Sequence, residues 1–147
     1  MDLQLTDKLA LVSGSTAGIG FAIATGLARE SARVIINGRT DQRVTAAVKR
    51  IRSTNANAKL EGIAADLGSR AGVEEVVRRF PNVEILVNNL GIFEPKPFDQ
   101  ISDEEWIRFI EINVMSGVRL SRAYLPSMKN RNWGRVVFIS SESGVQI

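Results

Sequence analysis

The sequence predicts an α/β fold in which a parallel sheet is wound with helices on both faces. Five apolar runs of strand length, residues 9–13, 33–37, 60–65, 83–89 and 135–140, alternate with helix-length segments whose apolar residues recur every three or four positions. The runs are apolar throughout, which is typical of strands that helices cover on both sides. We therefore expect a doubly wound sheet of five strands and four helices.

The predicted helices begin at residues whose side chains accept hydrogen bonds from free backbone N–H groups. The second helix begins after Thr40 or Asp41, the third after Ser69 and the fourth after Ser102. Glu105 lies three residues beyond Ser102, which completes a capping box. At spacings of three and four residues, the fourth helix then carries one continuous face, made of Trp106, Ile110, Asn113, Gly117, Leu120 and Tyr124.

Length and composition bound the class of protein. The 147 residues are 44% hydrophobic and contain neither a repeat nor a linker rich in Pro, Gly or Ser, so we expect one domain over residues 1–147. The absence of cysteine and histidine excludes disulfides, thiolate nucleophiles and the usual zinc or triad chemistry, and we expect no bound metal. The net charge of +3 and the lack of a membrane-length apolar run favour a cytoplasmic protein without a nucleic-acid or membrane partner.

Three glycines stand where the first strand passes into the first helix, in the stretch SGSTAGIG at residues 13–20. A helix N-terminus presents unpaired N–H groups to a phosphate, and glycine lets an anion approach the backbone without meeting a Cβ. The spacing is G-x-x-x-G-x-G, which differs from the commonest dinucleotide fingerprint. A tight turn without a ligand is the alternative. The predicted cofactor contacts in this loop are Gly14, Ser15, Thr16, Gly18, Ile19 and Gly20.

Other polar stretches follow the later strands. Asp66 follows the third strand, NNLG at residues 88–91 ends the fourth, and SSESG at residues 140–144 ends the fifth. The carboxyl ends of parallel strands meet at one edge of a sheet, where open α/β folds bind their ligands. These stretches and the glycine loop therefore predict a single site.

With these motifs in this order, the whole chain resembles the short-chain dehydrogenases/reductases, which have a Rossmann-like fold. SGSTAGIG is similar to the family's T-G-x-x-x-G-x-G cofactor loop, with Ser13 keeping the hydroxyl of the threonine. NNLG is similar to N-N-A-G, which lies under the adenosine and supports the central sheet, with Leu90 in place of alanine. The resemblance implies further cofactor contacts at Asp66, Leu67, Asn89 and Gly91.

The resemblance also implies two members of the family's catalytic set. Asn113 matches the helix asparagine of that set, although on spacing alone a core asparagine bonded to a neighbouring backbone group is the alternative. Ser141 matches the catalytic serine because it lies three residues before Gly144, and Ser140 and Ser143 are the weaker candidates. The family's Tyr-x-x-x-Lys pair, which transfers the proton, follows this serine on the next helix.

That proton-transfer pair is absent from residues 1–147. Tyr124 is the only tyrosine, Lys129 lies five residues beyond it rather than four, and Tyr124 falls on the predicted buried face, so we reject it as the acid/base. We expect the chain to be the N-terminal, cofactor-binding part of such an oxidoreductase, truncated after the fifth strand and inactive alone. The alternatives are a regulatory nucleotide-binding module without redox activity and an RNA-binding protein.

The end of the second strand bears on the choice of cofactor. A Rossmann-type fold that prefers NAD places an acid there to accept from the ribose 2′-OH. Asn37 and Gly38 offer no carboxylate, whereas Arg39 offers donors suited to a 2′-phosphate, so NADP is favoured over NAD. A solvated turn residue is the alternative for Arg39. The resemblance further implies a small-molecule carbonyl or alcohol substrate and a homo-oligomer, either a dimer or a tetramer.

Overall fold

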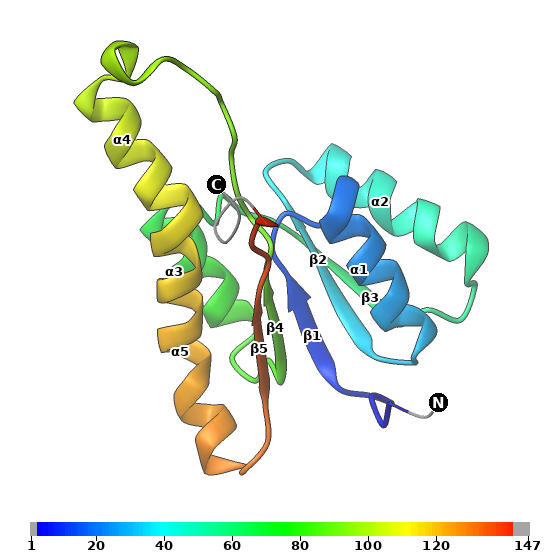
Figure 1. Cartoon of the computed structure of the whole chain (residues 1–147). Helices are drawn as coiled ribbons and strands as arrows, with labels where there is room; N and C mark the ends of the chain where they lie inside the picture. The colour runs from blue at the N-terminus through cyan, green and yellow to red at the C-terminus, as the bar shows by residue number, and fades with distance from the viewer. Residues whose placement is uncertain (1–2, 143–147) are drawn as a thin grey trace.

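The computed structural model describes residues 3–142, which form one five-stranded parallel sheet with the strand order β3-β2-β1-β4-β5 (Figure 1). Each strand falls on one of the predicted apolar runs, and the predicted α/β wound fold is confirmed. The central strand β1 pairs with both β2 and β4, so that Leu11 lies between Ile35 and Leu86. The strands are β1 (Leu9–Val12), β2 (Arg33–Gly38), β3 (Leu60–Ala64), β4 (Ile85–Asn88) and β5 (Arg135–Phe138).

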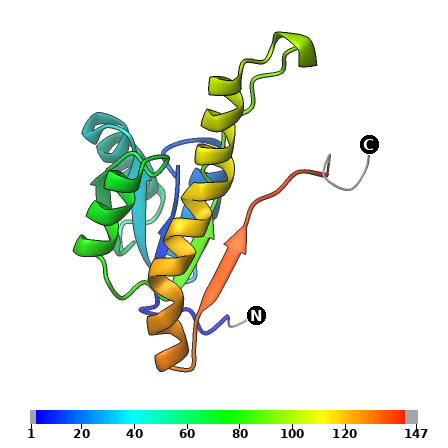
Figure 2. The ribbon, with the colours of Figure 1, turned by 90° about the vertical axis from the view of Figure 1, so that its left-hand side faces the viewer.

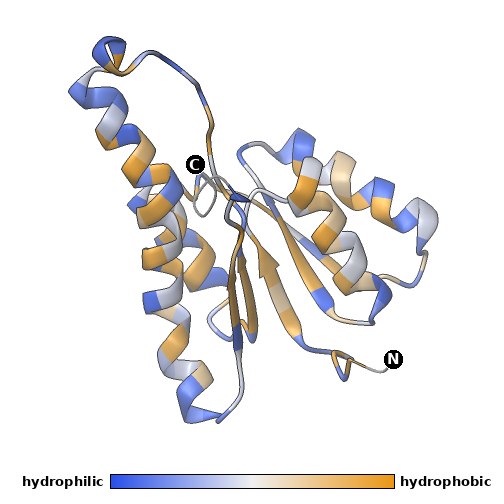
Figure 3. Ribbon diagram, viewed as in Figure 1, coloured by the Kyte–Doolittle hydropathy of each residue, from blue (hydrophilic) through white to orange (hydrophobic). Residues whose placement is uncertain are grey.

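Helices cover the two faces of the sheet in pairs. On one face, α1 (Gly18–Arg29) and α2 (Asp41–Thr54) pack against Ala10 and Val12 of β1. On the other face, α3 (Arg70–Arg79) and α5 (Ser116–Asn130) pack against Leu11. Alternate residues of one strand thus serve opposite layers, which requires the continuous apolar run seen in the sequence. Figure 3 shows the apolar residues gathered along the strands.

The predicted fourth helix is one rod in three parts. It runs from α4 (Asp103–Ile110) through a π-helical turn, η2 (Glu111–Met115), into α5, and a short 3₁₀ turn, η1 (Phe98–Gln100), precedes it. The Ser102–Glu105 capping box at its start is confirmed, as are Thr40 and Ser69 as the caps of α2 and α3.

The predicted buried face of this rod is only half right. Leu120 and Tyr124 of α5 are fully buried, whereas Trp106 and Ile110 of α4 are 45% and 51% exposed. Figures 1 and 2 show why: α5 lies along the sheet, but α4 continues past the ends of the strands. Spacing predicted the stripe correctly, but the stripe extends beyond the part of the sheet that could bury it.

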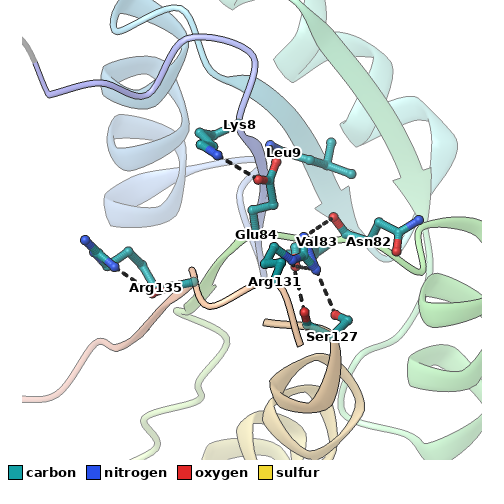
Figure 4. Close-up of polar contacts among 9 residues, drawn as sticks. Lys8, Leu9, Asn82, Val83, Glu84, Ser127, Arg131 and Arg135 are labelled. Atoms are coloured by element: carbon teal, nitrogen blue, oxygen red, sulfur yellow. Dashed lines mark hydrogen bonds and ion pairs between the residues drawn. The ribbon is translucent and has the colours of Figure 1, made fainter. Parts of the chain in front are cut away.

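Polar contacts join the elements at the amino-terminal end of the sheet (Figure 4). Glu84, just before β4, accepts hydrogen bonds from Lys8 Nζ at 3.0 Å and from the backbone N–H of Leu9 at 3.1 Å. Arg131, just after α5, donates to Ser127 Oγ at 2.8 Å and more weakly to the carbonyl of Val83 at 3.5 Å. These contacts hold β1, β4 and α5 together and leave the opposite end of the sheet to the predicted site.

Within residues 3–142, no helix is both long and apolar enough to cross a membrane.

Candidate functional site

The predicted site residues gather at the carboxyl edge of the sheet, where the loops after the strands lie (Figure 1). The glycine loop follows β1, Arg39 follows β2, Asp66 follows β3 and the NNLG stretch closes β4. Ser141 lies three residues beyond the end of β5. The parallel topology brings the first four of these segments to one rim although they are far apart in the sequence, whereas Figure 2 shows the chain leading away from the sheet after β5.

Each glycine of the loop has its own structural reason. Gly14 and Gly18 have φ values of +62° and +56°, in the left-handed region that side chains with a Cβ disfavour. Gly20 is required by packing, because a Cβ there would lie 2.4 Å from Asn89 Nδ2 and 2.6 Å from the carbonyl oxygen of Gly14. The spacing G-x-x-x-G-x-G therefore encodes two turn positions and one close approach to the loop after β4.

Ser13 ties the glycine loop to the loop after β4. Its Oγ accepts hydrogen bonds from the backbone N–H groups of Asn89 and Leu90, each at 2.9 Å, and donates to the carbonyl of Val87 at 3.3 Å. Asn89 Nδ2 donates in return to the carbonyl of Ser13 at 2.9 Å. The hydroxyl that Ser13 shares with threonine thus has a structural purpose, and Asn89 acts here as a brace between the loops.

Asn37 is a structural contributor to the site that sequence reasoning missed. It was considered only as a position without a carboxylate, but it is 2% exposed, and its Oδ1 accepts from the N–H of Gly14 at 3.1 Å. Its Nδ2 donates to the carbonyl of Ala65 at 3.0 Å, and its backbone N–H donates to the buried Ser15 Oγ at 2.9 Å. A polar residue at the end of an otherwise apolar strand was the signal for this role.

The N-terminus of α1 differs from those of α2, α3 and α4. Side chains cap α2, α3 and α4, but Ala17 gives α1 no side-chain cap. The first N–H groups of a helix lack intrahelical partners, so those of α1 can bind an anion at the rim. A Cβ at Gly18 would have no atom within 4 Å, and the neighbouring Ile19 is 64% exposed. Open donors beside an unobstructed glycine fit the pyrophosphate of a dinucleotide.

The remaining predicted cofactor residues differ in how they can contact a ligand. Asp66 is exposed, and its Oδ1 accepts from the N–H of Gly68 at 3.0 Å. The side chain of Leu67 is in the core at 1% exposure, so only its backbone can meet a ligand. Arg39 is exposed and has no ion-pair or hydrogen-bond partner within residues 3–142.

Asn113 lies in the π-helical turn and binds the loop after β4. Its Oδ1 accepts from the N–H of Ile92 at 2.7 Å, and its Nδ2 donates to the carbonyl of Ile92 at 3.1 Å. Gly91 approaches closely, since a Cβ there would lie 3.1 Å from Asn113 Oδ1. Asn113 is exposed, so it is not the core asparagine of the alternative interpretation, although it does pair with a backbone group. π-helical turns frequently occur at functional sites.

Two further predictions concern the catalytic groups. Ser141 is exposed beyond β5, whereas Ser143 and Gly144 lie outside the described residues. Tyr124 is fully buried, burial raises the pKa of its hydroxyl, and that hydroxyl has no hydrogen-bond partner in the described part of the chain. A phenol so placed cannot exchange protons with a substrate at the rim, which agrees with its rejection as the acid/base.

A parallel sheet with a glycine-rich turn at the carboxyl end of its central strand defines a Rossmann-like α/β protein. The sequence pattern of the short chain dehydrogenases matches residues 8–147, and the chain belongs to this family.

Individual relatives agree with this assignment. The chain is 51% identical over 145 residues to the uncharacterized oxidoreductase YvaG of Bacillus subtilis (strain 168). This match covers 99% of the chain and 55% of YvaG. It is 36% identical to a D-beta-hydroxybutyrate dehydrogenase of Cupriavidus necator, over 97% of this chain and 56% of the relative.

Among solved structures, L-sorbose reductase from Gluconobacter frateurii, complexed with NADPH and L-sorbose, has a TM-score of 0.90 at 33% identity. That match covers 99% of this chain and 57% of the reductase. The chain therefore spans little more than half the length of the proteins that it resembles.

Proposed function

We propose that this chain is the cofactor-binding part of an NADP(H)-dependent oxidoreductase that interconverts a small-molecule carbonyl and its alcohol. The observation that carries the proposal is the uncapped N-terminus of α1, which meets a glycine loop braced by Ser13, Asn37 and Asn89. Membership of the short chain dehydrogenases and the NADPH bound in the L-sorbose reductase structure support a nicotinamide cofactor.

Each group at the rim has a role in this proposal. The backbone N–H groups of α1 hold the pyrophosphate, Arg39 holds the 2′-phosphate, and Asp66 with the backbone of Leu67 meets the adenine. The nicotinamide, when bound, supplies or accepts the hydride. The hydroxyl of Ser141 donates to the substrate oxygen, and Asn113 holds the adjoining loop through Ile92 and orients a water molecule.

Reduction of a carbonyl adds a hydride to its carbon and a proton to its oxygen. In the family a tyrosine supplies that proton, with a nearby lysine stabilising its phenolate. Residues 1–147 contain no such pair. We therefore propose that residues 1–147 bind the dinucleotide but do not catalyse the reaction. The remainder of the protein supplies the acid.

The test is nicotinamide absorbance with a panel of ketones and aldehydes. We expect turnover by the full-length protein, a loss of about 10²-fold or more in Ser141→Ala, and no turnover by residues 1–147, since a positioned acid contributes about 10²- to 10⁴-fold. Ser140→Ala is the matched control and should retain activity. Dinucleotide binding without turnover in the full-length protein would favour the regulatory module instead, and turnover by residues 1–147 alone would overturn the assignment of roles.

The preference for NADP(H) has its own test in Arg39→Ala. Loss of a charge-assisted contact to the 2′-phosphate should weaken NADPH binding by about 1–3 kcal/mol and leave NADH binding nearly unchanged. Titrating both cofactors against both proteins measures this. Equal losses for the two cofactors, or a wild-type preference for NADH, would contradict the proposal.

We further propose that residues 1–147 form one domain, that the protein is cytoplasmic and homo-oligomeric, and that it binds neither nucleic acid nor membranes. The small net charge of +3 supports the absence of a nucleic-acid partner. The exposed apolar side chains of α4 and β5 support an oligomer or further covering chain.

A further inference from the structure

A groove of about 450 Å³ lies between α3 and α5, on the face of the sheet opposite α1 and α2. Its volume is in the range of small-molecule sites. None of the residues proposed for the cofactor or for catalysis lines it. Apolar side chains in its walls come from α3 (Val73 and Val77), from the end of η2 (Met115) and from α5 (Ala123).

The groove is also strongly basic. Arg70 and Arg78 enter it from α3, and Arg119 and Arg122 enter it from α5, against the single carboxylate of Glu74 among the lining residues described. Except for Arg119, these arginines have no ion-pair or hydrogen-bond partner within residues 3–142. The described part of the chain therefore neutralises the positive charge of the groove only in part, through Glu74 and through the partner of Arg119.

Arg119 is the least exposed of the four arginines. Its side chain is only 15% exposed, and its Nη2 pairs with Glu111 at 2.6 Å. Its Nη1 is buried and has no hydrogen-bond partner among the described residues. A buried donor without an acceptor is unfavourable, and a turn of the guanidinium toward an oxyanion in the groove would satisfy it.

We propose that this groove binds an amphipathic anion, with a carboxylate or phosphate head on an apolar body. The guanidinium groups of Arg119 and Arg122 suit an oxyanion, since they present several N–H donors in a planar fork. The apolar walls around Val77 suit a hydrocarbon body. Neither observation depends on the oxidoreductase activity proposed above.

Calorimetric titration of the full-length protein tests both halves of the proposal. We expect decanoate and decyl phosphate to bind about tenfold or more tightly than decanol, which lacks the charge, and than inorganic phosphate, which lacks the apolar body. Whichever of the two amphiphiles binds more tightly identifies the preferred head group. Equal binding of decanoate and decanol would overturn recognition of the anion, and inorganic phosphate binding as tightly as the amphiphiles would overturn the apolar subsite.

Variants then locate the site. Arg122→Gln should weaken decanoate binding about tenfold, and because Arg122 is exposed, the variant should fold. Arg79→Gln is the matched control: it removes the same charge from α3, but its guanidinium lies over the ring of Phe80 and does not line the groove. Equal effects of the two substitutions would overturn the site. So would a wild-type oligomer that dissociates in Arg122→Gln without ligand, because the groove would then be an interface between copies.

Discussion

The region around β1 and the region of β5 and α4 differ in how far the described chain bonds or covers the side chains there. Around β1, the side chains of Ser13, Asn37 and Asn89 form hydrogen bonds between the loops that follow β1, β2 and β4. At β5 and on α4, the large apolar side chains of Phe138 and Trp106 are 54% and 45% exposed.

The glycine-loop side of the rim is therefore held by contacts at the centre of the sheet, whereas the β5 side leaves large apolar side chains that a further layer would cover. The glycine loop packs against β2 and β4, which both flank β1 at the centre of the sheet. Within residues 3–142, β5 pairs with β4 alone, and its other edge presents unpaired backbone groups. Ser141 follows directly from this open edge.

The largest effect on stability is expected at Gly20, where the glycine loop packs closely against Asn89. Gly20→Ala would place a Cβ 2.4 Å from Asn89 Nδ2 and 2.6 Å from the carbonyl oxygen of Gly14. We expect a loss of about 2–3 kcal/mol in the free energy of unfolding, together with weaker dinucleotide binding. Urea unfolding and cofactor titration measure the two effects.

Gly26→Ala is the matched control on the same helix. A Cβ at Gly26 would have no neighbour within 4 Å, so alanine should stabilise α1 by about 0.5–1 kcal/mol. If the two alanine variants proved equally stable, the close packing of the glycine loop against Asn89 would not be the constraint that distinguishes this region.

A smaller effect is expected at the open edge. We expect residues 1–147 alone to associate or to bind an apolar dye, since β5 offers unpaired backbone groups beside Val137, which is 44% exposed. Val137→Lys should weaken this association about tenfold, as charged residues do on natural edge strands. Sedimentation and dye fluorescence measure it.

Val114→Lys is the control that distinguishes association through the strand edge from association through the helix. Val114 lies on the π-helical turn and is 50% exposed, so it offers the same chemical change away from β5. Association that is lost only in Val114→Lys would point to the helical rod, and a dye-free monomer of residues 1–147 would remove the contrast between the two regions.

The smallest effect is expected at Glu84, which anchors the other end of β1. Burial opposes its ionisation, but hydrogen bonds from Lys8 and from the backbone of Leu9 outweigh burial and hold the pKa of Glu84 below its ordinary value of 4.5. A lowered folded-state pKa stabilises the protein above the unfolded value, and this contribution is lost as the pH falls through the folded value.

Glu84→Gln should therefore cost about 1 kcal/mol at pH 7, and the difference from wild type should shrink below pH 4.5. Urea unfolding at several pH values measures it. Glu61→Gln, which breaks an exposed pair with Arg33, is the control and should change stability by less than about 0.5 kcal/mol. A constant difference for Glu84→Gln at every pH would show that its ionised carboxylate is not what stabilises β1.

Local patterns in the sequence were enough to predict the class of fold, the five strands and the caps of α2, α3 and α4, because apolar periodicity and capping residues act over a few positions. They also predicted the glycine loop, since the left-handed conformations of Gly14 and Gly18 are local requirements. The resemblance carried by the motifs extended this to the family.

Only the tertiary structure decided which polar residues brace the loop and which apolar ones are covered. Asn37 and Ser13 act through partners distant in sequence, and the π-helical turn at Asn113 leaves no mark in the periodicity of its helix. Trp106 repeats at core spacing, yet it is exposed because α4 continues past the sheet. A period states which residues share a face, whereas burial depends on what other segments of the chain lie against that face.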